Sequence, residues 1–272
     1  MLTKLLKYEW KSSGKLTLLL NAYIVLITVL GVIMIQSGLL EQMMNTMASE
    51  AEAESSVLGI VGSVLIFTYV ISIIAVSVAV CLFQIFRFYK NYYTDEGYLM
   101  HTLPVTPNQL ILSKGIFAFV ATLLTGVIVI VSVFSIILTS CPVDERVQFF
   151  TEMRKVLPEI AQECGFSSGM LIFIGTLHVI VTGVHSILAF YAALSIGQLF
   201  EKHKIMGSIL AYGIICTIEQ TVCMISMLLI TPHSPALYAR ISLIYPLVFS
   251  SITSIAFWFI TSHIMKNKLN LE

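Results

Sequence analysis

GIFAFVATLLTGVIVIVSVFSIIL, residues 115–138, is a stretch without a charged side chain, and its only polar groups are hydroxyls. An α-helix of about 20 mostly apolar residues is long enough to cross the ~30 Å hydrocarbon layer of a bilayer. A helix this apolar also lacks the polar face that a helix on the surface of a soluble domain turns toward water. The stretch therefore predicts a membrane-spanning helix.

Five further apolar runs repeat this pattern along the chain. The six expected spans cover residues 16–37, 57–80, 115–138, 169–194, 206–229 and 243–264. The composition agrees, since 57% of the 272 residues are hydrophobic and 11% are charged, whereas about a quarter of a soluble domain is charged. The sequence thus predicts an all-α integral membrane protein, with residues 1–272 forming one transmembrane domain. The net charge of +0 offers no basic face for nucleic acid.

The basic residues predict which way the spans run. Cytoplasmic segments of membrane proteins carry an excess of Lys and Arg. Most of the 15 basic residues lie in segments on the same side as the N-terminus. The other side holds only Arg146, Arg154, Lys155 and Arg240. Both termini are therefore expected in the cytoplasm.

Two further helices are expected outside the spans. Residues 2–12 place Leu and Trp on one helical face and Lys on another, which is typical of a helix in the headgroup layer. The alternative is that these lysines act only as orientation signals. Residues 143–163 repeat apolar side chains at helical spacing and predict an outer loop helix, which Pro158 breaks or restarts. This helix either caps the outer mouth of the domain or rests on the membrane surface.

The most informative stretch outside the spans is the cytoplasmic segment 87–114, between the second span and the third. Thr94 or Asp95 is placed to cap a short helix, and Pro104 ends it, because a proline pushes the residue before it out of helical geometry. The run TPNQ, residues 106–109, restarts a helix with threonine as N-cap, proline at the first position and glutamine three residues after the cap. A short helix lying across the membrane face is predicted here, and its mixture of tyrosines and acids suits a protein contact.

The run YTDEGYLMHTLPVT, residues 93–106, resembles the cytoplasmic loop signature of the six-helix permease subunits of bacterial type-two ABC exporters. The run LKYEWK, residues 6–11, and the ending KNKLNLE, residues 266–272, are similar to the same family. One departure is the outer segment 231–242. It leaves little room for the small re-entrant helices that related exporters often place there.

The resemblance implies a permease of the bacterial plasma membrane that works together with a second permease subunit, identical or related. Two separate ATPase subunits would bind on the cytoplasmic side and would hold the ATP and Mg²⁺. The coupling helix would lie at about residues 95–103 and sit in a groove of the ATPase. The contact residues that the resemblance implies are Tyr93, Asp95, Glu96, Gly97, Tyr98, Leu99, Thr102, Leu103 and Pro104.

The sequence lacks the common motifs for chemistry within this chain. It contains no G-x-x-x-x-G-K-[ST] phosphate loop and no G-x-G-x-x-G or H-E-x-x-H motif. The run GFSSG, residues 165–169, matches G-x-S-x-G by letter, but it leads into an expected span and not from a strand into a helix, which is the context that this motif requires. We therefore expect no catalytic residue, metal site or cofactor in this chain, with ATP hydrolysis in the partner. Peptides, antimicrobial compounds and lipids all stay open as substrates.

Glu219 lies near the middle of the fifth span, where an ionisable group costs at least ~2.5 kcal/mol unless it finds a partner or water. One face of the fourth span carries His178, Thr182 and His185. Because the two spans run antiparallel, a contact of Glu219 with one of these histidines is predicted. Three interpretations stay open: a polar patch on a translocation path, a hydrogen-bonded clasp between helices, and a protonated Glu219 satisfied locally. The competing functions are an ATP-independent transporter or channel that uses these residues, and a membrane sensor or assembly factor.

Small side chains outside the charged motifs give two further expectations. Cys141 and Cys164 flank the outer loop helix and are candidates for a disulfide in oxidising surroundings, or for free thiols in reducing ones. In the fifth span, small residues permit close approach of a neighbouring helix. These are Gly207, Ser208, Ala211 and Gly213.

Overall fold

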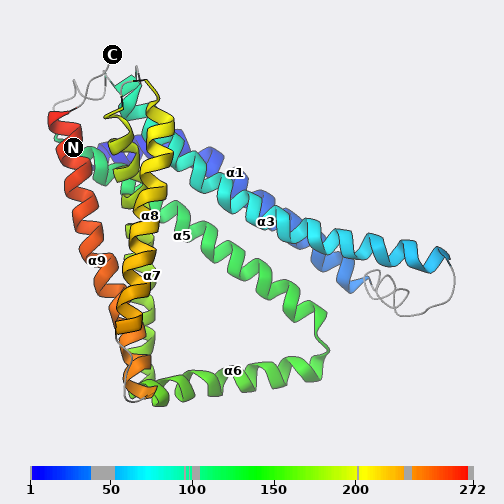
Figure 1. The fold of residues 1–272 in the computed structure, drawn as a ribbon. Helices are drawn as coiled ribbons and strands as arrows, with labels where there is room; N and C mark the ends of the chain where they lie inside the picture. Colours follow the sequence, from blue (N-terminus) through cyan, green and yellow to red (C-terminus); the bar gives the residue numbers. More distant parts are fainter. Residues whose placement is uncertain are drawn as a thin grey trace. The chain divides into compact units, whose positions relative to one another are not determined.

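The computed structural model describes residues 2–37, 53–94, 96–97, 99, 105–200, 202–229 and 235–268. Every long element in this part of the chain is an α-helix. In chain order they are α1 (Leu2–Gln36), α3 (Ala53–Tyr93), α5 (Pro107–Ser140), α6 (Val143–Cys164), α7 (Ser168–Gly197), α8 (Lys204–Leu229) and α9 (Pro235–Asn267) (Figure 1). The predicted all-α class is confirmed.

Six of these helices are long and apolar enough to cross a membrane, namely α1, α3, α5, α7, α8 and α9. They coincide with the six predicted spans and extend beyond most of them. Their most apolar windows bury only 6% to 28% of their residues inside the chain, so most of these side chains point outward. Such a surface suits hydrocarbon rather than water. By helix length and hydropathy, the chain is a multi-pass membrane protein.

The helices differ from the expectations at two places. Residues 2–12 do not form a separate helix, because α1 runs without interruption from Leu2 into the first span. The glycine on this path, Gly14, costs a helix only about 1 kcal/mol, which the helical residues on both sides outweigh. Pro158 lies inside α6 and does not break it. An interior proline removes one backbone hydrogen bond, and the apolar face of α6 continues on both sides of it.

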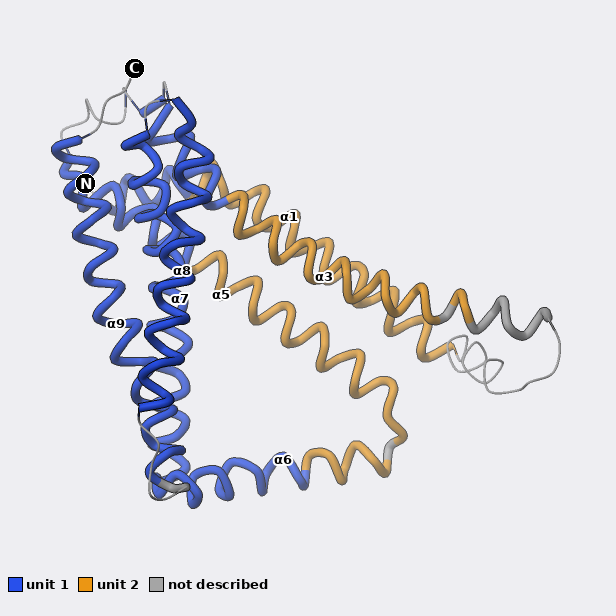
Figure 2. The backbone as a smooth tube through the Cα atoms, viewed as in Figure 1, with its two compact units in different colours: residues 1–9, 84–119, 151–272 blue, residues 10–83, 120–150 orange. Residues whose placement is uncertain are grey.

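The chain divides into two compact units (Figure 2). Unit 1 consists of residues 1–9, 84–119 and 151–272, and unit 2 consists of residues 10–83 and 120–150. The helices α7, α8 and α9 belong wholly to unit 1. Both clusters of polar side chains described below lie in unit 1.

Unit 2 is held together by apolar packing and by a short chain of hydroxyl groups. A buried cluster joins Ile24 of α1 to aliphatic residues of α3. Ser132 Oγ of α5 lies 2.6 Å from the Tyr69 hydroxyl of α3 and 2.5 Å from Thr28 Oγ1 of α1. Thr28 in turn donates to the Ile24 carbonyl at 2.7 Å. Hydrogen bonds of this kind join helices where no water is present to compete.

In unit 1, α7 packs along both α8 and α9. At the end of α7, a Cβ on Gly197 would lie 2.5 Å from the backbone nitrogen of Ser208 in α8, so the two backbones approach as closely as a glycine allows. Before the start of α7, Gly165 follows Cys164, the last residue of α6, and its φ of 64° is the left-handed geometry that glycine adopts without strain. Arg240 Nε of α9 donates to the Cys164 carbonyl there at 2.6 Å.

The small residues predicted to allow close helix packing in α8 do so only in part. Gly207, Ser208 and Ala211 are buried, whereas Gly213 is exposed and a Cβ on it would meet nothing within 4 Å. The close approach is therefore confined to the first half of the helix.

Candidate functional site

A buried cluster of aromatic and charged side chains joins α1, α3, α5 and α7 within unit 1. We call this cluster the hub. Its members are Glu9, Arg87, Phe88, Asn91, Tyr92, Tyr93, Lys114, Tyr191 and Ser195.

The charged half of the hub is centred on Glu9, the single acidic residue of α1. Its Oε1 lies 2.5 Å from Lys114 Nζ of α5, and its Oε2 lies 3.7 Å from Arg87 Nη2 of α3. In the amide orientation that satisfies both of its polar atoms, Asn91 accepts from Lys114 Nζ at 2.8 Å and donates to the Arg87 carbonyl at 3.1 Å. Glu9 is 7% exposed and Lys114 is 4% exposed. Removing either partner of such a buried pair would leave the other charge without compensation.

The aromatic half of the hub attaches the end of α3 to α7. The Phe88 ring stacks on Tyr191 with 3.7 Å between the ring centroids. Ser195 Oγ donates to the Tyr191 carbonyl at 2.7 Å. Its proton is thereby used, so the Tyr93 hydroxyl, 2.6 Å away, is the donor in the bond between Tyr93 and Ser195. Stacking and hydrogen bonding together hold the last turns of α3 against α7.

The segment between α3 and α5 begins and ends at the hub. Tyr92 donates to the carbonyl of Leu110, in the first turn of α5, at 3.0 Å. A Cβ on Gly97 would lie 2.6 Å from the Tyr92 carbonyl oxygen, so the chain folds back onto α3 at a distance that only glycine permits. Farther out, Lys90 and Glu96 form an ion pair at 3.0 Å with both side chains about half exposed.

The structure separates the predicted coupling residues into two groups. Glu96 is exposed and Leu99 is 69% exposed, so both are accessible to a partner. Tyr93 and Gly97 are buried within the chain, so neither is accessible in this structure, and their part in coupling stays a prediction. Because the Tyr93 hydroxyl finds a buried acceptor on α7, its ring packs inward and holds the segment in place. Outside the described residues lie Asp95, Tyr98, Thr102, Leu103 and Pro104.

A second polar cluster joins α7, α8 and α9. His185 Nε2 of α7 lies 3.4 Å from Glu219 Oε1 of α8. On its other side, His185 Nδ1 lies 3.1 Å from Thr253 Oγ1 and 3.4 Å from Ser254 Oγ of α9. The side chains of His185 and Glu219 are 14% and 21% exposed. Three helices thus meet at one imidazole ring.

Of the two predicted partners of Glu219, His185 is the one in contact. His178 and Thr182 share its face of α7, but within the described residues neither side chain makes a hydrogen bond or ion pair with Glu219. Thr182 is exposed. The three candidates for a translocation path on α7 therefore do not form one continuous polar cluster with Glu219.

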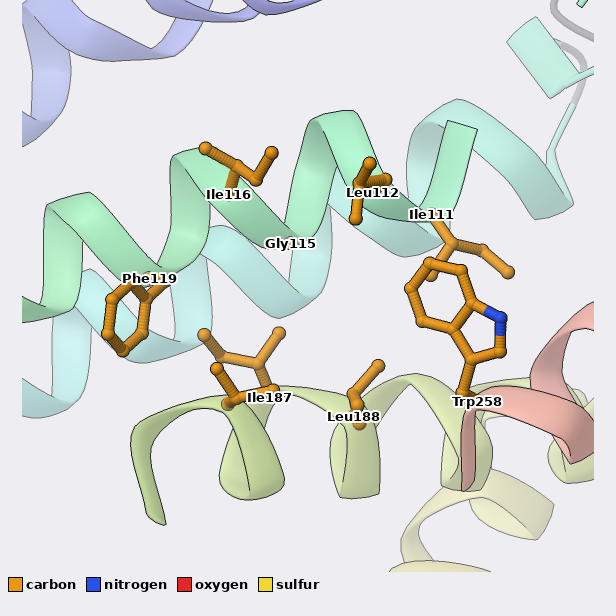
Figure 3. Close-up of a pocket in the computed structure, with 9 residues that line it drawn as sticks. Ile111, Leu112, Gly115, Ile116, Phe119, Ile187, Leu188 and Trp258 are labelled. Carbon is orange, nitrogen blue, oxygen red and sulfur yellow. The ribbon is translucent and has the colours of Figure 1, made fainter. Parts of the chain in front are cut away.

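An apolar pocket of about 170 Å³ lies between α5, α7 and α9 (Figure 3). Its walls include Gly115 and Phe119 of α5, Val184 and Leu188 of α7, and Trp258 of α9. No charged side chain lines it. Its walls therefore carry no charge, and Trp258 is their one side chain with a polar atom.

Cys141 and Cys164 are both free thiols. They flank α6, whose 22 residues extend about 33 Å at ~1.5 Å per residue. A disulfide requires Cα atoms within about 7 Å of each other. The candidate disulfide stays a prediction.

Known proteins offer no relative from which a function could be transferred to this chain. No protein-family model, curated protein or solved structure matches the chain. The helices by themselves establish a multi-pass membrane protein. Its function is inferred from its own residues.

Sequence reasoning misses the charged half of the hub and the hydroxyl groups on α9. In the sequence, Glu9 reads as part of a basic amphipathic stretch and Lys114 as an orientation signal. One indication was present, since Glu9 is the only acid among the lysines that precede the first span. A lone charge at a span needs a partner, but the sequence does not identify the partner. Thr253 and Ser254 look like ordinary helix residues until the rotation of α9 is known.

Proposed function

We propose that this chain is a permease subunit of an ATP-driven exporter and couples to a separate ATPase through the segment between α3 and α5. The observation that carries the proposal is the attachment of this segment to the hub. It follows Tyr93, which is bonded to Ser195 of α7, and it precedes Leu110, which accepts a hydrogen bond from Tyr92. The resemblance of residues 93–106 to the exporter signature supports the same assignment.

Through the hub, a displacement of the segment between α3 and α5 would be transmitted to α7. Close-packed rings and short hydrogen bonds transmit displacement because packed interiors yield little. Phe88 and Tyr93 at the end of α3 contact Tyr191 and Ser195 of α7, and α7 also carries His185. Closure of an ATPase pair around bound ATP would then shift the ends of α3, α5 and α7 together and reshape the path between two permease subunits.

The accessible part of the segment has the character of a small docking surface. Leu99 offers an exposed aliphatic side chain, and Glu96 offers an acid whose side chain is 53% exposed. A few anchors of this type usually carry most of the energy of a protein interface. A basic, partly apolar groove on the partner would match them.

The first test is copurification with the ATPase. Replacing Leu99, Tyr98 or Leu103 with Ala should weaken ATPase docking by about 1–3 kcal/mol, because each change removes an anchor without touching a span. We expect normal membrane levels, less ATPase retained on the tagged permease, and loss of transport-linked ATP hydrolysis. The matched control is Leu229→Ala, the same change at an 80% exposed leucine at the end of α8, which should retain the partner.

Full ATPase association and full transport in all three variants would remove this segment from the coupling mechanism. Vanadate-sensitive ATP hydrolysis by the purified chain alone would contradict the assignment more broadly. A permease of the proposed kind has its ATP site in the partner.

A second test concerns the direction of the spans. Single cysteines at positions 96 and 202 should be protected from an impermeant maleimide on intact cells, whereas cysteines at positions 52 and 159 should be labelled. The reason is the excess of Lys and Arg on the side of the N-terminus. The background lacks the five native cysteines, and permeabilised cells serve as the control in which positions 96 and 202 also react. Labelling of position 96 but not 159 on intact cells would reverse the proposed orientation.

The contact between His185 and Glu219 favours a second candidate, an ATP-independent transporter. An ionisable pair inside a helix bundle is typical of ion and proton pathways. The same copurification separates the two candidates, because only the exporter requires a partner with a phosphate-loop motif.

A further inference from the structure

The His185–Glu219 contact allows an account of its protons, because the hydroxyl groups beside it already use theirs. Thr253 Oγ1 lies 2.9 Å from the Phe249 carbonyl, and Ser254 Oγ donates to the Ser250 carbonyl. A hydroxyl group has one proton to donate but two lone pairs to accept with. When both hydroxyls keep these bonds, they face His185 Nδ1 as acceptors, and Nδ1 then carries a proton.

The other ring nitrogen then faces the carboxyl group of Glu219. With Nδ1 protonated, the pair holds its next proton either on Nε2, as imidazolium and carboxylate, or on Glu219, as imidazole and carboxylic acid. Both forms are neutral overall. Loss of that proton leaves a net negative charge among apolar helices, which is costly at this depth. We propose that His185 and Glu219 form a proton-binding site that holds one proton between α7 and α8 and releases it to water when the two side chains separate.

Among the described residues of α7, α8 and α9, the charged partner that Glu219 has is His185. The titratable side chains on the three helices, apart from the pair itself, are His178, Tyr191, Lys204, Tyr212, Cys216, Cys223, Tyr238, Arg240, Tyr245, His263 and Lys266. Arg240 and Lys266 lie near the two ends of α9, each about 20 Å along the helix from Thr253 at ~1.5 Å per residue. Of the ion pairs within the described residues, the one that includes Glu219 is made by His185.

The pocket between α5, α7 and α9, whose walls include Val184 next to His185 in the sequence, has no charged side chain. The one basic residue of α5, Lys114, forms an ion pair with Glu9 in the hub. A proton is therefore the counter-charge that remains for Glu219. This inference does not depend on the exporter assignment, because it concerns the proton that His185 and Glu219 hold and not the process that drives transport.

The experiment is to count the protons of the pair by NMR in the full-length protein in lipid nanodiscs. Labels of ¹⁵N in histidine and ¹³C in the glutamate carboxyl report the tautomer, the imidazolium and the protonated acid. The NMR signals of His185 and Glu219 are assigned because each is lost in the corresponding variant, His185→Gln or Glu219→Gln. His178→Gln is the matched control, the same substitution two turns away on the same face of α7.

At neutral pH we expect Nδ1 of His185 to be protonated and one further proton on either Nε2 or the Glu219 carboxyl. On raising the pH, both labels should change at one shared midpoint. In Glu219→Gln, His185 should hold a single ring proton, on Nδ1, at neutral pH, because the carboxyl group that shares the second proton is gone. His178→Gln should leave the behaviour of the pair unchanged.

A neutral His185 beside an ionised Glu219 at neutral pH would overturn the proposal, and so would independent midpoints for the two labels. These measurements on the wild-type protein decide the question even if a variant fails to fold. Failure of ATPase copurification would not bear on them, so the two proposals can fail separately.

Discussion

Replacing Glu9 with Gln is expected to destabilise the protein by about 3–5 kcal/mol, the usual cost of breaking a buried ion pair by removing one partner. The change keeps the shape of the side chain but removes the charge that compensates Lys114 at 2.5 Å and Arg87 at 3.7 Å. Lys114, at 4% exposure, cannot turn to solvent without opening the hub. The measurement is the free energy of unfolding in a fixed detergent, by titration with a denaturing detergent.

The matched control is Glu96→Gln, the same substitution in the exposed pair with Lys90. Exposed pairs contribute about 0–1 kcal/mol, so this variant should unfold nearly as the wild type does. Adding Lys114→Met to Glu9→Gln should recover part of the lost stability, because the uncompensated cation is then removed as well. Equal effects of Glu9→Gln and Glu96→Gln would show that the charged half of the hub does not stabilise the fold.

Replacing Gly197 with Ala is the second change with a large expected effect. The new Cβ would lie 2.5 Å from the backbone nitrogen and 2.6 Å from the Cα of Ser208, besides meeting its hydroxyl oxygen. These are backbone atoms, so α7 and α8 must move apart. Overpacking of this kind costs about 1–3 kcal/mol, and we expect the upper end because a helix has to shift. The thermal unfolding midpoint in detergent should fall accordingly.

Gly213→Ala in α8 is the matched control for this prediction. A Cβ there meets nothing within 4 Å, and a helical Gly→Ala change in open space gains about 0.5–1 kcal/mol from reduced chain entropy. The two variants should therefore change the unfolding midpoint in opposite directions. A midpoint for Gly197→Ala at or above that of the wild type would mean that α7 and α8 are not in close contact.

The spans were predictable because each depends on a local property, a run of apolar residues long enough to cross a bilayer. The sequence limited the predicted partner of Glu219 to two histidines, His178 and His185. Counting residues from the span ends gives depth, but not the rotation and offset that select His185 over His178. Residues 2–12 and Pro158 show the opposite limit: an amphipathic pattern did not mark a separate helix, and a proline did not end α6, since the neighbouring helical turns outweigh a single glycine or proline.

The hub could not be predicted, because its bonds join residues far apart in the chain. Glu9 and Lys114 each read as ordinary charges beside a span, and only the fold brings their side chains together. Tyr93 reads as a surface aromatic in a cytoplasmic loop, yet it is buried because Ser195, on a different helix, offers an acceptor. Pairings of this kind depend on tertiary structure, which one sequence does not encode in any local pattern.

The outward-facing apolar side chains of the six spans have a consequence for any measurement on this protein. With at most 28% of their most apolar windows buried in the chain, the spans leave much apolar surface for the acyl chains around them. The thickness of the host bilayer, and how tightly it fits the hydrophobic length of the helices, then contributes to stability directly. A melting temperature obtained in one detergent is consequently a property of that mixture, and variants should be ranked only within a single lipid or detergent.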